Sequence, residues 1–448
     1  MIPSNIFRSY DIRGIYPAEL NEEAAYLIGQ AFVKYTGAKK IVVGRDMRLS
    51  SPTIFDSLSR GIIETGCDIY DLGEVSTEMI YFTVGNYNYD AGIMITASHN
   101  PKEYNGFKLV KKEGKRIQFV SGKEMIGAIG KETGIKAKKF GETKKLDIWQ
   151  DYIEHLFSFV DINKIKPFKV VIDAGNGMAG KVIPKISQKL PIKIISLNFD
   201  LDGNFPAHPS NPLFEGSAEQ ISKEVKEEKA DFGFIFDGDA DRIFLIDEKG
   251  DFKKGDTTLL LLAKYFLEKN LGKGIAYNLI CSKAVPEFIK KWGGNPIRTP
   301  AGFLNVQKGL LENNGIMGGE ISGHYCFKDN FYADSGFISF LILLQIISES
   351  SKKVSDITKE LSPYATDSEI NFKIENKEET ISKIKEKYSD GKQDYLDGVT
   401  VEYKDWWFNI RPSNTELLLR LTIEADTQDL LKQKSREIKD FLSLEDPR

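Results

Sequence analysis

The stretch that decides the fold spans residues 232–242 and reads FGFIFDGDADR. Its first five residues form a short apolar run, which is typical of a strand buried on both faces of a parallel sheet. Asp237, Asp239 and Asp241 follow at alternate positions in one loop. Because open α/β sheets bind ligands beyond the carboxyl ends of their strands, we expect this acidic loop to lie at a ligand site.

The charges of the acidic loop indicate a cation. At about 4 Å and an effective dielectric constant of about 20, each pair of carboxylates costs roughly 4 kcal/mol, and oxygen ligands favour Mg²⁺. A solvated turn is one alternative. A calcium loop is the other, because Glu248 stands twelfth when Asp237 is counted as first. The calcium interpretation is disfavoured because Arg242 occupies the sixth position, which requires glycine, and because residues 243–246 predict a returning strand.

Bulk composition excludes several classes of function. The 448 residues are 41% hydrophobic and 28% charged, with a net charge of −4, so we expect a globular protein of several domains that binds neither nucleic acid nor membranes. The longest apolar stretch, residues 337–347, is too short to span a bilayer. No signal peptide is visible, and the three scattered cysteines lack metal-ligand spacing, so we expect reduced, buried thiols and a cytoplasmic location.

Strand-like runs alternate with helical periodicity along the chain, which predicts βαβ units. These runs cover residues 41–46, 170–177, 232–241 and 274–280. We therefore expect three α/β domains with mixed, largely parallel sheets and a smaller C-terminal α+β domain around a central cleft. Charged segments and shifts of composition place the domains at residues 1–147, 148–248, 249–364 and 365–448. In the third domain, Asp256 is expected to cap a helix over residues 257–269.

Two further clusters lie in the first domain. Ser98 follows the apolar residues 93–95 within Thr96–Pro101, and a serine there is either a turn former or a nucleophile. The Gly-x-Ser-x-Gly elbow of serine hydrolases is missing, and the acidic loop elsewhere in the chain favours a phosphoryl carrier. Lys108, ten residues downstream, is either a solvated surface residue or a group that transfers a proton or pairs with phosphate.

Polar residues also cluster in the third and fourth domains. Gly318–His324 combines Glu320, Ser322 and His324 with glycines, which suits sugar hydroxyls, although a glycine-rich turn with an incidental histidine fits as well. The second cluster, Arg411–Glu416, offers a guanidinium, two hydroxyls and an amide, the groups of a compact anion receptor. A helix-capping box is the alternative there, but the strand pattern of residues 417–423 disfavours it.

Together these motifs resemble those of the α-D-phosphohexomutase family, over essentially the whole chain. The segments that carry the resemblance are Tyr10–Gly14, Gly44–Asp46, Thr96–Pro101, Asp173–Gly180, Asp237–Arg242, Gly319–His324 and Arg411–Glu416. The resemblance implies a phosphoserine at Ser98 and Mg²⁺ bound by Ser98, Asp237, Asp239 and Asp241. It also implies that Arg13, Arg242 and Tyr10 line the transfer site, that Lys108 is the acid/base group, and that Glu320, Ser322 and His324 hold the sugar. The phosphate that does not react would be held by Arg411, Ser413, Asn414 and Thr415.

The reaction that the resemblance implies is the interconversion of hexose 1-phosphate and 6-phosphate through a hexose 1,6-bisphosphate. Glu-Ile-Ser at 320–322 is closer to the Glu-Met-Ser of mannose and glucose enzymes than to the Glu-Gln-Ser of phosphoglucosamine mutases. A phosphoglucosamine mutase and a non-catalytic sugar-phosphate-binding protein are the alternatives, and we expect a monomer or homodimer. The chain departs from the family at Ile280 and Phe303, where some relatives carry Lys and His.

Overall fold

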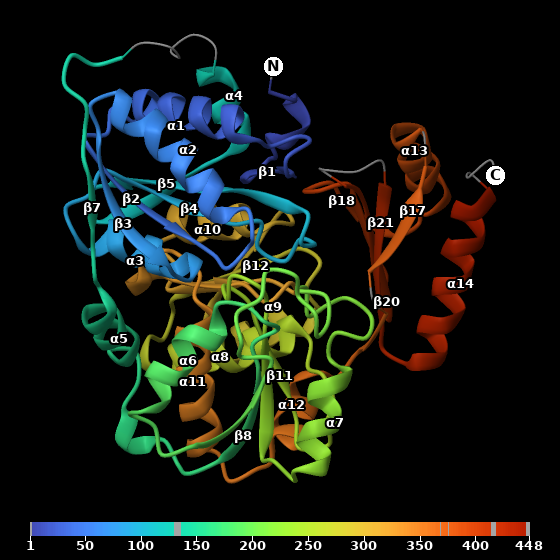
Figure 1. Ribbon diagram of the computed structural model, residues 1–448. Helices are drawn as coiled ribbons and strands as arrows, with labels where there is room; N and C mark the ends of the chain where they lie inside the picture. The colour runs from blue at the N-terminus through green and yellow to red at the C-terminus, as the bar shows by residue number, and fades with distance from the viewer. Residues whose placement is uncertain (1, 130–135, 368, 375, 414–417, 445–448) are drawn as a thin grey trace.

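The computed structural model describes residues 2–129, 136–367, 369–374, 376–413 and 418–444, which form four α/β and α+β domains in chain order (Figure 1). The four-domain architecture predicted from the sequence is confirmed. The boundaries given above stay a prediction.

The first domain is built on a seven-stranded mixed sheet. Its order is β1 (Ile12–Ile15), β5 (Tyr104–Glu113), β4 (Ala91–Ile95), β2 (Lys40–Arg45), β3 (Asp68–Glu74) and β7 (Thr143–Lys145), with β6 (Arg116–Val120) paired to β5. Helices α1 (Glu22–Thr36) and α2 (Ser51–Glu64) cover one face and α3 (Thr77–Asn86) the other, and α4 (Gly122–Ala128) lies beside α1 (Figure 1). Side chains of β2 alternate between the two faces, with Ile41 and Val43 against α1 and α2 and Val42 on the α3 side.

The second domain carries the acidic loop. Its sheet has the order β11 (Ile243–Ile246), β10 (Phe232–Phe236), β8 (Lys169–Asp173) and β9 (Lys193–Leu197), and its helices are α5 (Trp149–Phe157), α6 (Ala179–Ser187) and α7 (Glu219–Glu227). Strand β10 is fully buried and runs parallel to β8, as the sequence predicted. The returning strand β11 pairs antiparallel with β10, so the acidic loop joins two strands and is not followed by the helix of a calcium loop.

The third domain repeats the pattern with the sheet order β13 (Asn295–Thr299), β12 (Gly274–Asn278), β14 (Met317–Gly319) and β15 (Tyr325–Phe327). Its helices are α8 (Gly255–Lys269), α9 (Ala284–Lys291), α10 (Phe303–Glu312), α11 (Gly336–Glu349) and α12 (Val354–Leu361). Helix α11 contains the longest apolar stretch and is a buried core helix. The capping role predicted for Asp256 is wrong, because α8 begins at Gly255, two residues earlier than predicted, with Lys254 as its N-cap. The Asp256 carboxylate accepts instead from the backbone amides of Thr257 and Ser282.

The fourth domain is an antiparallel sheet covered by two helices. Its order is β16 (Ala365–Thr366), β21 (Leu418–Ala425), β20 (Trp406–Pro412), β19 (Val399–Glu402) and β18 (Lys392–Asp394), with β17 (Ile370–Lys373) paired to β21. Helices α13 (Lys377–Lys387) and α14 (Gln428–Leu444) complete it. It has a hydrophobic core of its own, whereas one continuous core joins residues of the first three domains.

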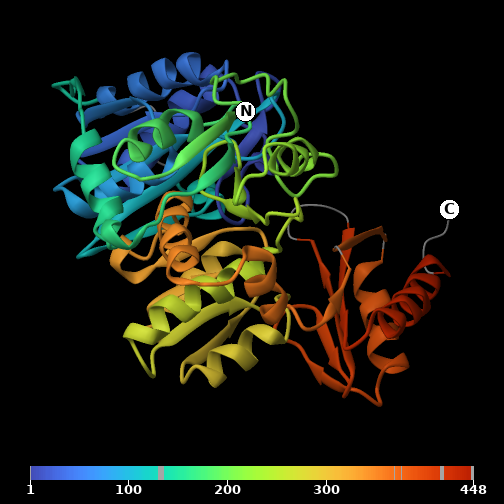
Figure 2. The same cartoon turned by 90° about the horizontal axis from the view of Figure 1, so that it is seen from below.

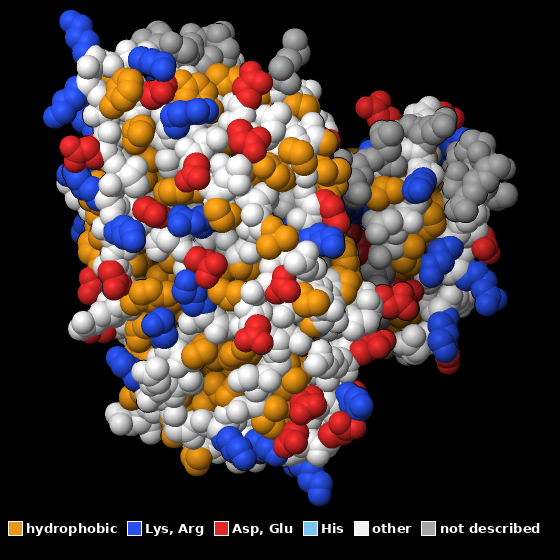
Figure 3. All heavy atoms as spheres, viewed as in Figure 1, with side chains coloured by type: hydrophobic (Ala, Val, Ile, Leu, Met, Phe, Trp, Pro, Cys, Tyr) orange, Lys and Arg blue, Asp and Glu red, His pale blue; other side chains and the backbone are white. Residues whose placement is uncertain are grey.

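The C-terminal domain therefore stands as a separate lobe beside the third domain (Figure 2). The space-filling view shows a hollow between this lobe and the main body (Figure 3). No helix among the described residues is long and apolar enough to cross a membrane. The three cysteines are unpaired and buried, as expected.

Candidate active site

The acidic loop lies buried between the end of β10 and the start of β11. The side chains of Asp237 and Asp239 are fully buried, and that of Asp241 nearly so. Ligand oxygens of the three carboxylates lie within 4.8 Å of one another. Gly238 is required here, because a Cβ atom on it would meet the Ser98 carbonyl oxygen at 2.7 Å. The prediction that one loop gathers three carboxylates is thus met by the geometry.

Two cations offset part of this negative charge. The Lys108 ammonium on β5 lies 2.7 Å from Asp239 Oδ2 and also pairs with Asp241, and Arg242 Nε lies 3.6 Å from Asp237 Oδ2. Burial lowers the pKa of Lys108, but the charges of Asp239 and Asp241 outweigh it and raise that pKa. Burial, followed by the charges of Asp241 and Asp239, raises the pKa of Asp237 well above its ordinary value. The negative charge is therefore not fully compensated by the protein.

The carboxylate oxygens left without partners fit a hard cation. Asp239 Oδ1 and Asp241 Oδ1 are buried and accept no hydrogen bond. Leaving such an atom unsatisfied costs free energy, because water no longer solvates it. Oxygen atoms in this number, already within one small volume, are the ligand set that Mg²⁺ prefers.

Ser98 lies against the acidic loop, from the turn that follows β4. Its side chain is fully buried, and its Oγ donates to Asp237 Oδ2 at 3.1 Å. Its φ of 51° is left-handed, which a residue other than glycine adopts only when its surroundings hold it there. Ser98 Oγ also lies 3.2 Å from Nδ1 of His99. Burial and then the charge of Arg242 lower the pKa of His99 well below its ordinary value, so this ring is neutral.

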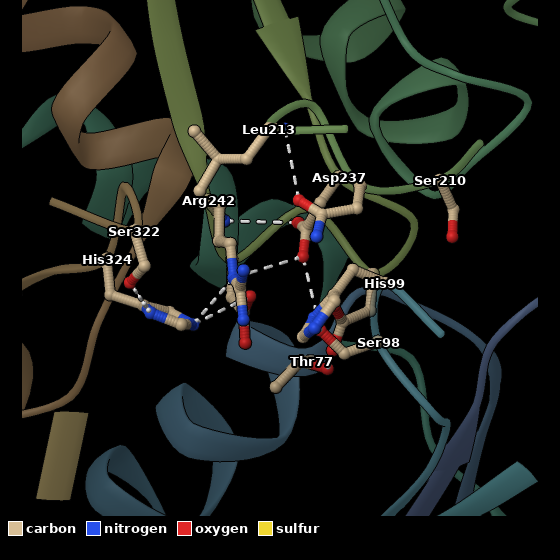
Figure 4. Close-up of polar contacts among 12 residues, drawn as sticks. Thr77, Ser98, His99, Ser210, Leu213, Asp237, Arg242, Ser322 and His324 are labelled. Carbon is tan, nitrogen blue, oxygen red and sulfur yellow. Dashed lines mark hydrogen bonds and ion pairs between the residues drawn. The ribbon is translucent and has the colours of Figure 1, made fainter. Parts of the chain in front are cut away.

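The sugar cluster predicted at 320–324 faces the acidic loop from the other side. Figure 4 shows Asp237 and Arg242 between Ser98 and His99 on one side and Ser322 and His324 on the other. His324 Nδ1 lies 2.9 Å from Glu320 Oε1, while His324 Nε2 lies 3.4 Å from Asp241 Oδ1 and 3.2 Å from Arg242 Nε.

The charge state of His324 follows from these neighbours. Burial and the charge of Arg242 lower its pKa, but Asp241 and Glu320 raise it further, to about 9. Nδ1 of the ring donates to Glu320, while Nε2 accepts from the Nε–H of Arg242 and lies beside Asp241. The charged groups of the acidic loop and of the sugar cluster are therefore in direct contact, although they come from two different domains.

Arg13 and Tyr10 come from the start of the chain. Arg13, on β1, donates to Asp11 Oδ2 at 2.8 Å and to Asn100 Oδ1 at 2.6 Å, so it lies beside the serine loop. Tyr10 donates to the Ala301 carbonyl oxygen at 3.2 Å, which links the first domain to the third. The structure thus places Arg13 next to the serine loop and Tyr10 at a domain junction.

The anion receptor predicted at 411–416 lies in the C-terminal lobe. Arg411, at the end of β20, is buried, and its guanidinium contacts Asn409 Oδ1 at 3.4 Å and pairs with Glu369. The backbone amide of Ser413 donates to Leu418 O at 2.8 Å. Asn414, Thr415 and Glu416 lie outside the described residues. These partners of Arg411 belong to the lobe itself.

Comparison with known proteins agrees with this arrangement. Models of the phosphoglucomutase/phosphomannomutase family match the chain in four consecutive pieces: alpha/beta/alpha domain I at residues 4–133, domain II at 150–250, domain III at 254–364 and the C-terminal domain at 369–440. The chain belongs to this family. The resemblance to the α-D-phosphohexomutases is thereby confirmed, and the protein is an enzyme of the mutase class.

Individual relatives cover nearly the whole chain. A phosphomannomutase of Methanocaldococcus jannaschii is 37% identical over 443 residues, which is 98% of this chain and 97% of the relative. Phosphohexose mutases of Xanthomonas campestris pv. campestris are 35% identical over 448 residues, 97% of this chain and 98% of the relative. The crystal structure of a phosphoglucomutase/phosphomannomutase family protein from Burkholderia thailandensis has 30% identity and a TM-score of 0.89, covering 100% of this chain and 99% of that one.

Within this family fold, sequence reasoning missed one well-placed residue, Arg48. Its fully buried guanidinium donates from Nε to Asp46 Oδ2. The two terminal nitrogens donate to the backbone carbonyls of Ser98, Asn100, Pro101 and Tyr104 at 2.6–2.9 Å. All five N–H donors of the side chain are thus used, three of them on the serine loop (Thr96–Pro101) and one on Tyr104 at the start of β5. The signal in the sequence was the Asp46-x-Arg48 spacing directly after strand β2.

The two departures from the family have ordinary packing environments. Ile280 is buried after β12. Phe303, the first residue of α10, packs its ring 5.3 Å from that of His324 and 5.6 Å from that of Phe119, measured between ring centres. An aromatic ring therefore lies beside the sugar cluster at the position where some relatives carry histidine.

Proposed function

We propose that the protein is a Mg²⁺-dependent phosphohexomutase that interconverts the 1-phosphate and 6-phosphate of mannose, glucose or both. One observation carries this proposal. The Ser98 hydroxyl, held in a left-handed turn, lies 3.1 Å from one carboxylate of a buried group of three. A nucleophile beside a cation site suits a phosphoryl carrier better than an acyl carrier.

The proposed metal ligands are Asp237, Asp239, Asp241 and a Ser98 oxygen. Bound there, Mg²⁺ would supply a Lewis acid that withdraws charge from a phosphoryl group. The protein's own contribution is to hold Ser98 in place, to bring the guanidiniums of Arg13 and Arg242 to the same volume, and to exclude water by burial.

The proposed reaction has two half-reactions in one place. The P–O bond to Ser98 breaks as the free hydroxyl of the hexose phosphate forms a new P–O bond, which gives the 1,6-bisphosphate. Ser98 Oγ takes a proton from the proton-transfer group as it leaves, the hydroxyl proton restores that group, and the intermediate turns so that its other phosphate returns to Ser98. Lys108 is the proposed proton-transfer group. Because Asp239 and Asp241 raise its pKa, it begins as a proton donor in this arrangement.

Substrate holding is proposed for the two remaining clusters. Glu320, Ser322 and His324 would bind sugar hydroxyls, since carboxylate, hydroxyl and imidazole groups converge there within hydrogen-bonding distance of one another. Arg411, Ser413, Asn414 and Thr415 would hold the phosphate that does not react. The relatives named phosphomannomutase do not favour the phosphoglucosamine alternative. Hexose phosphates are thus the proposed partners.

The decisive experiment combines intact mass with a coupled assay. We expect one phosphoryl group per chain, lost in Ser98→Ala, and turnover of mannose or glucose 1-phosphate that requires Mg²⁺. Comparison of kcat/KM for mannose, glucose and glucosamine phosphates assigns the sugar. A chain that carries no phosphate, or turnover that persists after chelation of all divalent cations, would contradict the proposal.

A further inference from the structure

Two arginines face each other across the sheet of the C-terminal lobe. Arg411 on β20 and Arg420 on β21 are directly opposite partners in the antiparallel register. Like charges in such a pair repel and destabilise the sheet. The Arg411 side chain is only 6% exposed, so solvent does little to screen the repulsion. An anion that pairs with both guanidiniums therefore relieves the repulsion.

Glu369 supplies that anion in this structure. It lies immediately before β17, which pairs with the other edge of β21. One carboxylate oxygen pairs with Arg411, and the other lies 3.4 Å from Arg420 Nη1. A carboxylate that bridges two guanidiniums uses the same planar donors that grip a phosphate group. Glu369 thus pairs with the guanidinium of Arg411, the group that we propose binds the substrate phosphate.

We propose that Glu369 is an internal competitor of the substrate phosphate: it pairs with Arg411 in the free enzyme and must give up this guanidinium when the phosphate binds. The proposal rests on the proposed role of Arg411 as a phosphate ligand. Glu369 keeps Arg420 as a partner when Arg411 is released, so its displacement leaves no isolated charge. No covalent step is involved.

Competition between Glu369 and the substrate phosphate would help a mutase of the proposed kind to release its intermediate. The lobe must hold one phosphate, release the bisphosphate intermediate and then hold the other phosphate. A carboxylate that takes the guanidinium back lowers the affinity for both phosphates alike. The apparent dissociation constant equals the intrinsic one divided by the fraction of time for which the guanidinium is free of the carboxylate. The lobe thereby releases the bisphosphate intermediate more easily, so that it can reorient.

The test measures glucose 6-phosphate binding by calorimetry on the full-length chain in a Ser98→Ala background, where the proposed transfer cannot occur. Glu369→Gln keeps the size of the side chain and removes its charge. We expect it to tighten binding about tenfold and, because the two arginines then repel each other, to lower the Tm. Asp367→Asn is the matched control, since Asp367 accepts from Ser435 on α14 and its substitution removes one charge from the same segment. Its affinity should remain unchanged.

A second variant separates this inference from the proposed function. Arg411→Gln, alone and combined with Glu369→Gln, should weaken binding and abolish the gain. If Arg411→Gln binds normally, the proposed phosphate role of Arg411 is wrong. If Arg411→Gln binds weakly but Glu369→Gln binds no more tightly than the parent, the role of Arg411 stands and the competition is refuted. If Glu369 had only a general structural role, Glu369→Gln would bind glucose 6-phosphate more weakly, which is the opposite of the change we expect.

Discussion

The buried centre and the C-terminal lobe have opposite balances of charge. At the centre, three carboxylates of one loop are met by Lys108, Arg242 and His324, and two of their buried oxygens accept no hydrogen bond. In the lobe, Arg411 and Arg420 both pair with the carboxylate of Glu369. An excess of carboxylates calls for a cation, and an excess of guanidiniums calls for an anion. The sign of the local excess therefore agrees with the proposed roles: a metal site at the centre and a phosphate site in the lobe.

The comparison predicts that variants of the two regions have different effects on the enzyme. Variants of the centre should change turnover and its dependence on Mg²⁺ while leaving phosphate binding by the lobe nearly intact. Variants of the lobe should change the affinity for hexose phosphate, with little effect on the Mg²⁺ dependence. The following three predictions test the centre, from the largest expected effect to the smallest.

Ser98→Ala should abolish turnover. Loss of a nucleophile lowers kcat by at least about ten-thousand-fold, and Ser98 is the proposed phosphoryl carrier. Steady-state assays with saturating hexose phosphate measure kcat, and calorimetry measures the affinity for glucose 6-phosphate. We expect the affinity to stay within about twofold of the wild type because the lobe is unchanged. Loss of binding together with turnover would break the separation of the two regions.

Asp239→Asn should weaken Mg²⁺ activation. Removing one charge and one ligand oxygen should cost more than the roughly 10- to 100-fold that follows loss of an outer partner of a metal ligand. The measurement is kcat as a function of Mg²⁺ concentration.

Thr77→Val is the matched control for Asp239→Asn. The Thr77 hydroxyl donates to Asp239 Oδ2 at 2.5 Å and is such an outer partner, so its loss should have the smaller effect. Equal Mg²⁺ curves for Asp239→Asn and the wild type would remove Asp239 from the ligand set.

Arg48→Lys should lower kcat about 10- to 100-fold with little change in KM. An ammonium has three donors and cannot replace the five of the guanidinium, so the serine loop loses part of its support. A misplaced reacting group costs about this much. The phosphate content of the variant, measured by intact mass, should fall along with kcat.

Arg45→Lys is the control for Arg48→Lys. Arg45 stands three residues earlier and pairs with Asp71 at 2.9 Å instead of with the serine loop. We expect it to change Tm by a similar or smaller amount and to leave kcat near that of the wild type. An equal loss of kcat in both variants would make Arg48 a general stability residue.

Much of the fold and part of the site were predictable because they depend on short stretches of chain. Strand β10, its turn and the returning strand β11 follow from local patterns of apolar and small residues. The loop after strand β10 was expected at a ligand site because α/β sheets bind ligands beyond the carboxyl ends of their strands, and the family resemblance implied that the loops after β4 and β14 join it. The prediction that Asp256 caps α8 was wrong because a tertiary contact replaced the local one. Asp256 accepts a hydrogen bond from the backbone amide of Ser282, which is distant in the chain.

The sequence by itself determined the chemical inventory: an acidic loop behind a buried strand, a serine in a turn, a sugar cluster and an arginine near the C-terminus. Only the tertiary structure decided which charges meet. Lys108 reaches Asp239 across 131 residues of chain, Arg48 reaches the Ser98 carbonyl across 50, and Glu369 reaches Arg411 across 42. With 61 basic and 65 acidic residues, composition alone allows too many pairings. The packing of the domains selects among them, because a buried charge is stable only next to the partner that the fold brings to it.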